Sequence, residues 1–361
     1  MRGQGVKLIG YVPNGYMPLE LIHACDSVPI PLFYGGNYAQ VEESSAYLAR
    51  FLDTFSRAQI GYRFSNSEDL YQMLDLLIVP VTDNHIRAIA DSWDFYTDVD
   101  VFRLGVPHAK TEHGLTYYLE GLELVKKKLE NLSETPITNQ RLADEIASYN
   151  RRKSLLREIS LLRKSNPPAL SGSQFIRLNH SCHLVDKSFV LQILEQLSYE
   201  IKKSNDRPAI GPRIMLTGST LAFGDSKVID LIEQAGASIV MEEFCEGIES
   251  YWEDVETGGS LLDALADCYF TKKIPGAFFR GAARERFARI LKLAGDFTID
   301  GMVYYSLMYR DAYDVEAYLF GRAMKNRRLP FIKVTSDYDA SETGALKTRI
   351  EAFIEMISYG G

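Results

Sequence analysis

Short apolar runs alternate with longer amphipathic stretches along most of the chain, and this alternation restricts the possible folds more than any other feature. In the first half, runs of strand length cover residues 6–12, 28–33, 76–81 and 101–106. Helices are predicted between them, beginning near Pro18, Ala39, Asp83 and Lys110. Strands that are separated by helices pair in parallel, and a parallel sheet is covered by helices on both faces. Residues 1–115 are therefore predicted to form a doubly wound α/β lobe.

The middle of the chain has a different composition, with charged and helix-favouring sequence from about Lys110 to Ser165. Apolar residues there recur three and four positions apart, so each helix presents one apolar stripe. The charges of "VKKKLE" and "NRRKSLLR" are interpreted as solvated helix faces. Two prolines and a Gly-Ser pair in "SNPPALSGS" then end this run. We expect a helical connecting region over residues 116–205.

A second α/β pattern follows the connecting region. Strands are predicted at "PRIMLTGST", "ASIVMEEF", "GMVYYSLM" and "PFIKVTSD". Helices are predicted at "DSKVIDLIEQAG", "YDVEAYLFGRAMKNRR" and "TGALKTRIEAFIEMI". Residues 206–361 are therefore predicted to form a second lobe with its own parallel sheet. In such sheets ligands bind at the carboxyl ends of the strands.

The charge and hydropathy of the chain exclude two classes of partner. A formal net charge of −8 and an isoelectric point near 5.4 argue against nucleic-acid binding, which requires a basic face. No apolar run is long enough to cross a membrane, and the first residues lack the sections of a signal peptide. We expect a cytoplasmic protein.

The cysteines and histidines do not form a recognisable metal motif. Cys25, Cys182, Cys245 and Cys268 are widely separated without a CxxC pair, so each is expected to be a buried small hydrophobe. His180 and His183 flank Cys182, but one sulfur without a second cysteine or an acidic partner nearby is an incomplete site. We favour a helix-cap or interface role for these histidines.

Two further motifs argue against common catalytic classes. "TGSTLAFGD" follows a strand and opens a helix, but it is neither GxGxxG nor a P-loop, and it is interpreted as a tight βα turn. In "MEEFCEG" the carboxylates around Cys245 disfavour a thiolate, so an activated nucleophile is not expected there. No GxSxG nucleophile elbow occurs.

Five stretches together resemble one protein family. They are "GYMPLELIHACDSVPIPLF", "DLLIVPVTDNHIRAI", "PRIMLTGSTLAFGDSKVIDLIEQAGASIVMEEFCEG", "DGMVYYSLMYRDAYDVEAY" and "PFIKVTSDYDASETGALKTRIEAFIEM". In this order and across nearly the whole chain, they are similar to the D-component family of 2-hydroxyacyl-CoA dehydratases and benzoyl-CoA reductases. The resemblance implies two flavodoxin-like or Rossmann-like lobes in one subunit of a two-subunit enzyme of anaerobic metabolism.

The resemblance also implies a cofactor and a reaction type. Such enzymes carry a 4Fe–4S cluster that is held by cysteines from loops at the strand ends. A separate ATP-hydrolysing iron–sulfur activator supplies one low-potential electron, and a radical of the acyl-CoA thioester then forms. The outcome is a dehydration (a lyase reaction) or a ring reduction (an oxidoreductase reaction). A thiolate-ligated cluster at a subunit interface can reach the low potential that this chemistry needs.

This chain departs from the family at the cluster ligands. Thr82 and Arg310 stand where family cysteines are expected, and the further cysteine that is usual near residues 105–114 is absent. Thr is too weak an acid and Arg remains protonated, so neither can replace a thiolate. Only Cys245 stands where some subunits of the family have a cysteine. The 4Fe–4S cluster is therefore not expected to be bound by this chain alone.

From the resemblance, we expect one face formed by Thr82, Asp83, His85, Cys245 and Arg310. Tyr34 and Gly35 are expected to contact the substrate. Cys245 is the one candidate metal ligand, and no catalytic residue is identified. Arg310 is expected to bind a carboxylate, a CoA phosphate or a partner's backbone, or else to pair with neighbouring Asp311 or Asp314.

The leading hypothesis is a partner subunit that lacks the three-cysteine site. It would form a heterodimer with a cluster-bearing paralogue, or a homodimer, across the face that contains Thr82, Cys245 and Arg310. One alternative is a non-catalytic scaffold or binding protein that keeps the fold. Another is a subunit whose only contribution to an intersubunit cluster is Cys245.

Overall fold

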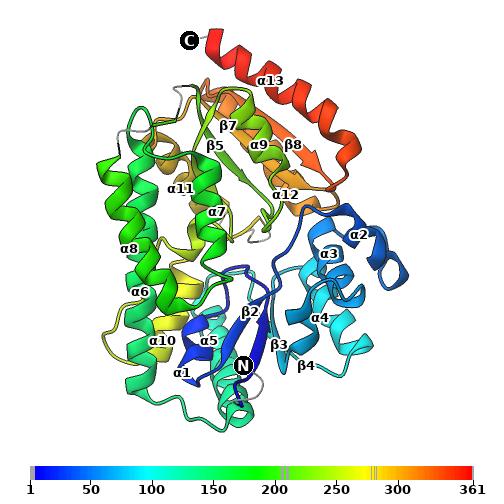
Figure 1. Ribbon diagram of the computed structural model, residues 1–361, viewed down its shortest axis with the longest axis vertical. Coiled ribbons are helices and arrows are strands. Elements are labelled where there is room, and N and C mark those ends of the chain that lie inside the picture. Colours follow the sequence, from blue (N-terminus) through cyan, green and yellow to red (C-terminus); the bar gives the residue numbers. More distant parts are fainter. Residues whose placement is uncertain are drawn as a thin grey trace.

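Two four-stranded parallel sheets, each surrounded by helices, form the framework of the molecule (Figure 1). The computed structural model describes residues 5–204, 207–208, 211–277, 279, 281 and 283–359. The strand orders are β2-β1-β3-β4 and β6-β5-β7-β8, so both sheets have the same topology. The chain reverses direction across the sheet at β1 and at β5, the switch point where doubly wound sheets bind ligands. The predicted fold, a two-lobed doubly wound α/β protein, is confirmed.

The first sheet contains the four strands that were predicted in the first half. They are β1 (Leu8–Tyr11), β2 (Val28–Pro31), β3 (Leu76–Val81) and β4 (Asp100–Gly105). The helices beside them are α1 (Leu19–Ala24), α2 (Tyr38–Glu43), α3 (Thr54–Phe64) and α4 (Asn84–Tyr96). Successive residues of β3 face opposite sides, since Leu77 and Val79 belong to one hydrophobic core and Leu76 and Ile78 to another.

Helix α3 was not predicted from the sequence. The first eight residues of "TFSRAQIGYRF" are all buried, among them Ser56, Arg57 and Gln59. Polar and apolar side chains are buried alike, so the sequence has no apolar stripe with helical spacing. The helix begins instead with a cap, because the Asp53 carboxylate accepts a hydrogen bond from Ser56 N at 2.8 Å.

The second sheet consists of β5 (Arg213–Gly218), β6 (Ser238–Glu243), β7 (Gly301–Leu307) and β8 (Phe331–Ser336). Its helices are α9 (Lys227–Gln234), α11 (Ala283–Asp296), α12 (Asp311–Asn326) and α13 (Thr343–Tyr359). All four strands were predicted, whereas α11 was not. Ile214 and Leu216 of β5 belong to the same buried hydrophobic cluster as Leu77 and Val79 of the first lobe. One hydrophobic core therefore continues from one lobe into the other.

Long helices join the lobes along one side (Figure 1). They are α6 (Asn139–Leu161), α7 (Gly172–Ser181) and α8 (Lys187–Lys203), whereas α5 (Glu112–Ser133) packs in the core of the first lobe. Ile146 and Tyr149 of α6 lie in a core cluster of the first lobe, and Leu156 and Ile159 lie in a cluster of the second. Leu265, from the short helix α10 (Leu261–Ala266), also packs in the first-lobe cluster. Among the described residues no helix is long and apolar enough to cross a membrane.

The charged segment "NRRKSLLR" was predicted to be a solvated helix face, which is wrong for two of its charges. It lies in α6, where Arg152 and Lys153 are buried. The stripe of α6 that packs inward is thus partly cationic, and the usual separation of charged and apolar faces does not hold there.

Candidate functional site

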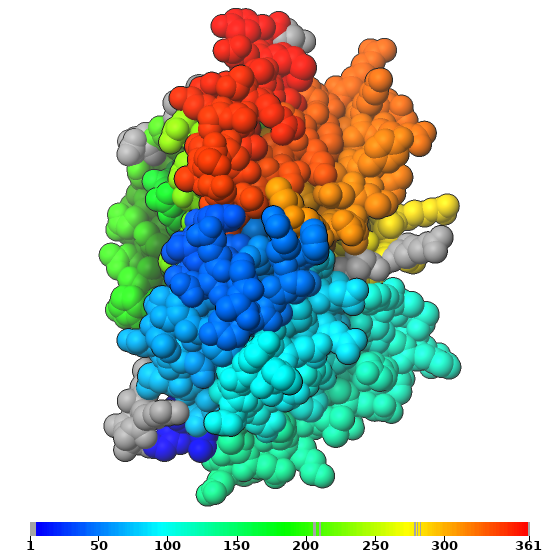
Figure 2. Space-filling model, turned by 90° about the vertical axis from the view of Figure 1, so that its right-hand side faces the viewer, coloured from blue at the N-terminus to red at the C-terminus, as the bar shows by residue number. Residues whose placement is uncertain are grey.

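The carboxyl ends of the two sheets face each other across the boundary between the lobes (Figure 1). The loop after β2 lies against the loop after β5, since Phe223 N donates to Phe33 O at 3.0 Å and Gly35 N to Phe223 O at 2.9 Å. Tyr34 and Phe223 form an isolated parallel bridge. Figure 2 shows the blue segment around α2 and α3 packed directly on the orange and red part of the second lobe.

Glycines permit this close approach of the two backbones. A Cβ on Gly35 would lie 2.5 Å from Ala222 Cβ, and one on Gly36 would lie 2.3 Å from Gly224 O. Gly36 also has a φ of +73°, which other residues adopt at a cost. Tyr34 and Gly35 are therefore part of the contact between the lobes, and their role in substrate binding stays a prediction.

Residues that follow β1, β3, β5, β6 and β7 meet in one small cavity at this boundary. Its lining includes Asn14, Thr82, Ser219, Cys245 and Arg310. The remaining volume is about 10 Å³, which is room for about one water molecule. The structure thus brings together the ends of the central strands of both sheets, at the two switch points.

Arg310 bridges the two lobes. Its side chain is 5% exposed, and Nη1 lies 3.3 Å from Asp53 Oδ2 and 3.3 Å from Asp83 Oδ1. The expected pairing with Asp311 or Asp314 is wrong, because Asp311 is exposed and Asp314 pairs with Lys333 at 2.7 Å. The acids come from the other lobe because the two sheets face each other.

Both acids that pair with Arg310 are also helix caps. Asp83 accepts from His85 N at 2.8 Å and from Ile86 N at 3.2 Å, as expected of an N-cap. Burial raises the pKa of Asp83, but the charge of Arg310 and these amides outweigh it and hold the pKa below its usual value. Asp83 is therefore an ionised partner of Arg310 at neutral pH.

His85 and Thr82 belong to the same hydrogen-bonded group. His85 Nδ1 accepts from Asp53 N at 3.0 Å, and it lies 3.2 Å from Asp53 Oδ2. Thr82 Oγ1 donates to Asp83 Oδ2 at 3.2 Å. With Thr82 3% exposed, this group lies between the lobes of one chain, and not on an outer face as expected from the sequence.

A second group of buried polar side chains lies next to Cys245, and only one of its members attracted attention in the sequence. It comprises Tyr16, Glu246, Glu249 and Lys273, each with a buried polar atom that has no hydrogen-bond partner. Lys273 Nζ lies 3.9 Å from Glu249 Oε2 and 4.6 Å from the centre of the Tyr16 ring. Unpaired polar atoms are rare in protein interiors and cluster at functional sites. Glu246 was noted beside Cys245 in the sequence and Glu249 could have been, whereas no motif marks Lys273.

Burial changes the protonation of this group. It raises the pKa of Glu246 to about 7 and that of Glu249 to about 6, despite the opposing charge of Lys273. It also raises the pKa of the Cys245 thiol to about 12, although Lys273 acts in the other direction. Cys245 is therefore a neutral thiol at physiological pH, and Glu246 can gain or lose a proton there.

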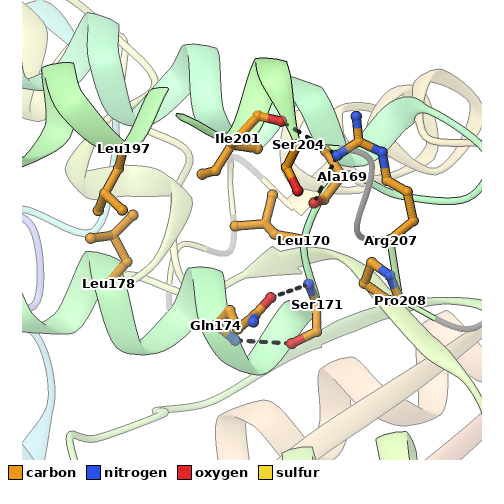
Figure 3. Close-up of a pocket in the computed structure, with 10 residues that line it drawn as sticks. All are labelled: Ala169, Leu170, Ser171, Gln174, Leu178, Leu197, Ile201, Ser204, Arg207 and Pro208. Carbon is orange, nitrogen blue, oxygen red and sulfur yellow. Dashed lines mark hydrogen bonds between the residues drawn. The ribbon is translucent and has the colours of Figure 1, made fainter. Parts of the chain in front are cut away.

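A larger hollow lies away from this boundary, between α7 and α8 (Figure 3). Its volume is about 560 Å³, and its floor is apolar. The polar groups in it bond to one another, since Ser171 N donates to Gln174 Oε1 at 2.9 Å and Gln174 N to Ser171 Oγ at 3.1 Å. We assign this hollow no chemistry.

The sequence of the chain matches a known protein family. Residues 14–357 match the family "2-hydroxyglutaryl-CoA dehydratase, D-component", and the chain belongs to that family. It is 25% identical to the "Putative dehydratase subunit YjiM" of Escherichia coli strain K12, over 99% of this chain and 93% of that protein. It is 22% identical to the beta subunit of (R)-2-hydroxyglutaryl-CoA dehydratase of Acidaminococcus fermentans, over 99% and 94%. It is 20% identical to a benzoyl-CoA reductase subunit of Thauera aromatica, over 97% and 91%.

The side chains at the boundary do not fit the 4Fe–4S cluster that the resemblance implies. Cys245 supplies a single protonated thiol, while Thr82 and the guanidinium of Arg310 stand at the other expected ligand positions. Within the described part of the chain, no three His, Cys, Asp or Glu side chains are grouped so that they could hold a metal ion. A cluster needs several thiolates, and a protonated guanidinium has no electron pair to offer to iron.

Proposed function

We propose that this chain is a partner subunit of an enzyme of the 2-hydroxyacyl-CoA dehydratase or benzoyl-CoA reductase type, and that it does not itself hold the usual cluster. The observation that carries the proposal is Arg310, which occupies the strand-end corner together with Asp53 and Asp83. The substrate would be an acyl-CoA. The cluster and the electron from the ATP-dependent activator would reach the complex through a cluster-bearing paralogue. Four free cysteines fit the reducing cytoplasm, which we propose as its location.

The chain would also contribute a proton-handling group. Dehydration and ring reduction both move protons, and a carboxyl with a pKa of about 7 can carry one at neutral pH. Glu246 lies at the cavity that contains Cys245 and Arg310. We therefore include Glu246 in the proposed site, beside the residues expected from the sequence.

The first test measures metal in the separated chain. Expressed alone without oxygen, the chain should purify with no stoichiometric 4Fe–4S cluster, because one thiol cannot hold it. Iron and sulfide analysis and the charge-transfer absorption provide the measurement. Cys182→Ser is the matched control for Cys245→Ser. A full cluster that disappears in Cys245→Ser but not in Cys182→Ser would refute the proposal.

The same samples distinguish the alternatives once a cluster-bearing paralogue is co-purified without oxygen. Iron that is lost from the complex in Cys245→Ser would favour a shared cluster to which this chain gives one ligand. A paralogue that turns over acyl-CoA equally well with and without this chain would favour a scaffold. Turnover that requires this chain but not Cys245 would support the proposed partner subunit.

An exposed apolar row on α12 supports the expected assembly. Val315, Tyr318 and Leu319 are 62%, 66% and 53% exposed and lie on one face of the helix. The double substitution Val315→Lys and Leu319→Lys should abolish dimerisation or capture of the paralogue, because it places two charges in an apolar contact. Light scattering and co-purification measure the effect. Phe95→Lys, at an exposed aromatic of α4, is the control that should leave assembly intact. A wild-type chain that stays monomeric with the paralogue present would contradict the prediction.

A further inference from the structure

Arg152 is a buried cation without an acidic partner. It is 7% exposed, and among the described residues no carboxylate lies within ion-pair distance of it. Nη1 donates to Cys182 O at 3.3 Å, the guanidinium lies 4.7 Å from the centre of the Tyr149 ring, and Nε has no partner. Its neighbour Lys153 differs, because Glu20 Oε1 lies 3.7 Å from Lys153 Nζ. Burying an unpaired guanidinium is costly, so a retained one requires an explanation.

Two cavities meet at Arg152. The outer one has a volume of about 210 Å³ and lies between the β2 region of the first lobe and the segment that joins α7 to α8. The inner one, of about 40 Å³, extends to Cys245 and Glu249. Both are lined by Leu19, Tyr149, Arg152 and His183. Arg152 therefore stands at the neck between an outer pocket and the boundary between the lobes.

The outer cavity is mainly apolar, apart from its inner end. Its apolar lining consists of Leu19, Val28, Pro29, Ile30, Pro31, Leu70, Leu184 and Val185. Lys187 in its wall is already bonded to Glu145, and the exposed Asp186 is bonded to Ser188 as the cap of α8. Lys187 is itself a cation, and Asp186 is not available to neutralise Arg152. The cavity thus offers an apolar wall and a cationic inner end.

His183 adds a hydrogen-bonding group at the same neck. Its Nδ1 lies 3.1 Å from Tyr11 Oη, and its Nε2 is buried without a partner. Burial and the nearby charge of Arg152 hold the pKa of His183 well below its usual value, so the ring is neutral. Arg152 and His183, each with a buried unpaired nitrogen atom, thus line the same cavity.

We propose that this pocket binds a small carboxylate with a short apolar tail, whose oxygen atoms pair with Arg152. A planar guanidinium suits a carboxylate, and the ligand would supply the anionic partner that Arg152 lacks. The cavity is below the size of pockets that hold drug-sized molecules, so the ligand is small. The apolar wall favours a carboxylate over inorganic phosphate. The inference is independent of the proposed function, because it concerns binding by the isolated chain.

Calorimetry on the purified full chain tests the ligand class. The probes are 3-methylbutanoate, its neutral analogue 3-methylbutanamide, and inorganic phosphate. The acid should bind, and the amide and phosphate should bind at least about tenfold more weakly. Equal binding of acid and amide, stronger binding of phosphate than of the acid, or no binding of the acid would each overturn the proposal.

Two matched variants test the residues. Arg152→Met should abolish binding of 3-methylbutanoate, whereas Arg151→Met should leave it unchanged, because Arg151 is exposed on the same helix and pairs with Glu195 at 2.8 Å. Val185→Trp at the cavity wall, 41% exposed, retains Arg152 and should weaken binding by narrowing the entrance. Because Val185 is exposed, this variant should fold even if Arg152→Met does not. Unchanged affinity in both folded variants would refute the site.

Discussion

Replacing Arg310 with alanine is expected to lower the free energy of unfolding by about 3–5 kcal/mol, the range for breaking a buried pair by removing one partner. The substitution leaves Asp53 and Asp83 buried without the cation that lies 3.3 Å from each. Urea unfolding of the isolated chain at neutral pH measures the loss. Arg322→Ala, on the exposed side of the same helix, is the control and should cost under about 1 kcal/mol.

The pH dependence of this loss identifies its cause. The pKa of Asp83 is lowered in the folded chain, so its stabilising contribution is present above the unfolded pKa of about 3.9 and is lost as the pH falls through the lower folded value. The difference in stability between wild type and Arg310→Ala should therefore narrow below about pH 4. A small loss at neutral pH, together with impaired assembly or turnover, would instead show that Arg310 serves a partner or a substrate.

Replacing Glu246 with glutamine is expected to stabilise the chain in mildly alkaline solution. The pKa of Glu246 is raised by burial to about 7, so the folded chain keeps a proton that the unfolded chain releases near its ordinary pKa. Stability from this group is complete below the unfolded pKa and is lost as the pH rises through 7. The amide cannot ionise, so the free energy of unfolding of Glu246→Gln should exceed that of wild type by up to about 3 kcal/mol at pH 8 and match it below about pH 4.

The quantity to measure is the difference in free energy of unfolding between wild type and Glu246→Gln. Asp225 and Glu249 also have raised pKa values, so they too make stability fall as the pH rises, and taking the difference removes their contribution. Urea unfolding at several pH values provides this difference. Glu355→Gln, at an exposed position of α13, should follow the wild-type curve. If the curves of wild type and Glu246→Gln run parallel from pH 5 to pH 8, Glu246 is already ionised in the folded chain and cannot be the proposed proton-handling group.

The strands and the two-lobed fold could be predicted because their signal is local. An apolar run such as "LLIVPV" in β3 needs burial on both faces whatever surrounds it. Helices α3 and α11 were missed, and α3 shows why, since its buried face includes Ser56, Arg57 and Gln59. Its identity as a helix depends on tertiary contacts that bury polar groups, and periodicity does not encode those contacts.

The sequence indicated several residues of the site but did not indicate which of them form ion pairs. Thr82, Asp83 and Arg310 were singled out from the family resemblance, and the structure brings them together. The acids of Arg310 were misassigned to its own helix, because 257 residues separate it from Asp53 in the sequence. Arg152 was interpreted as a solvated charge, since nothing local distinguishes it from Arg151. Long-range pairing and the burial of single charges require the folded chain.

The hydrophobic core that continues from the first sheet into the second has a consequence for molecular motion. Leu77 and Ile214 belong to one buried cluster, and α6 packs with its two halves on different lobes. A hinge motion that opened the lobes would expose this core and separate Arg310 from Asp53 and Asp83, at a cost comparable with that of global unfolding. The lobes therefore form one cooperative unit rather than a closing clamp.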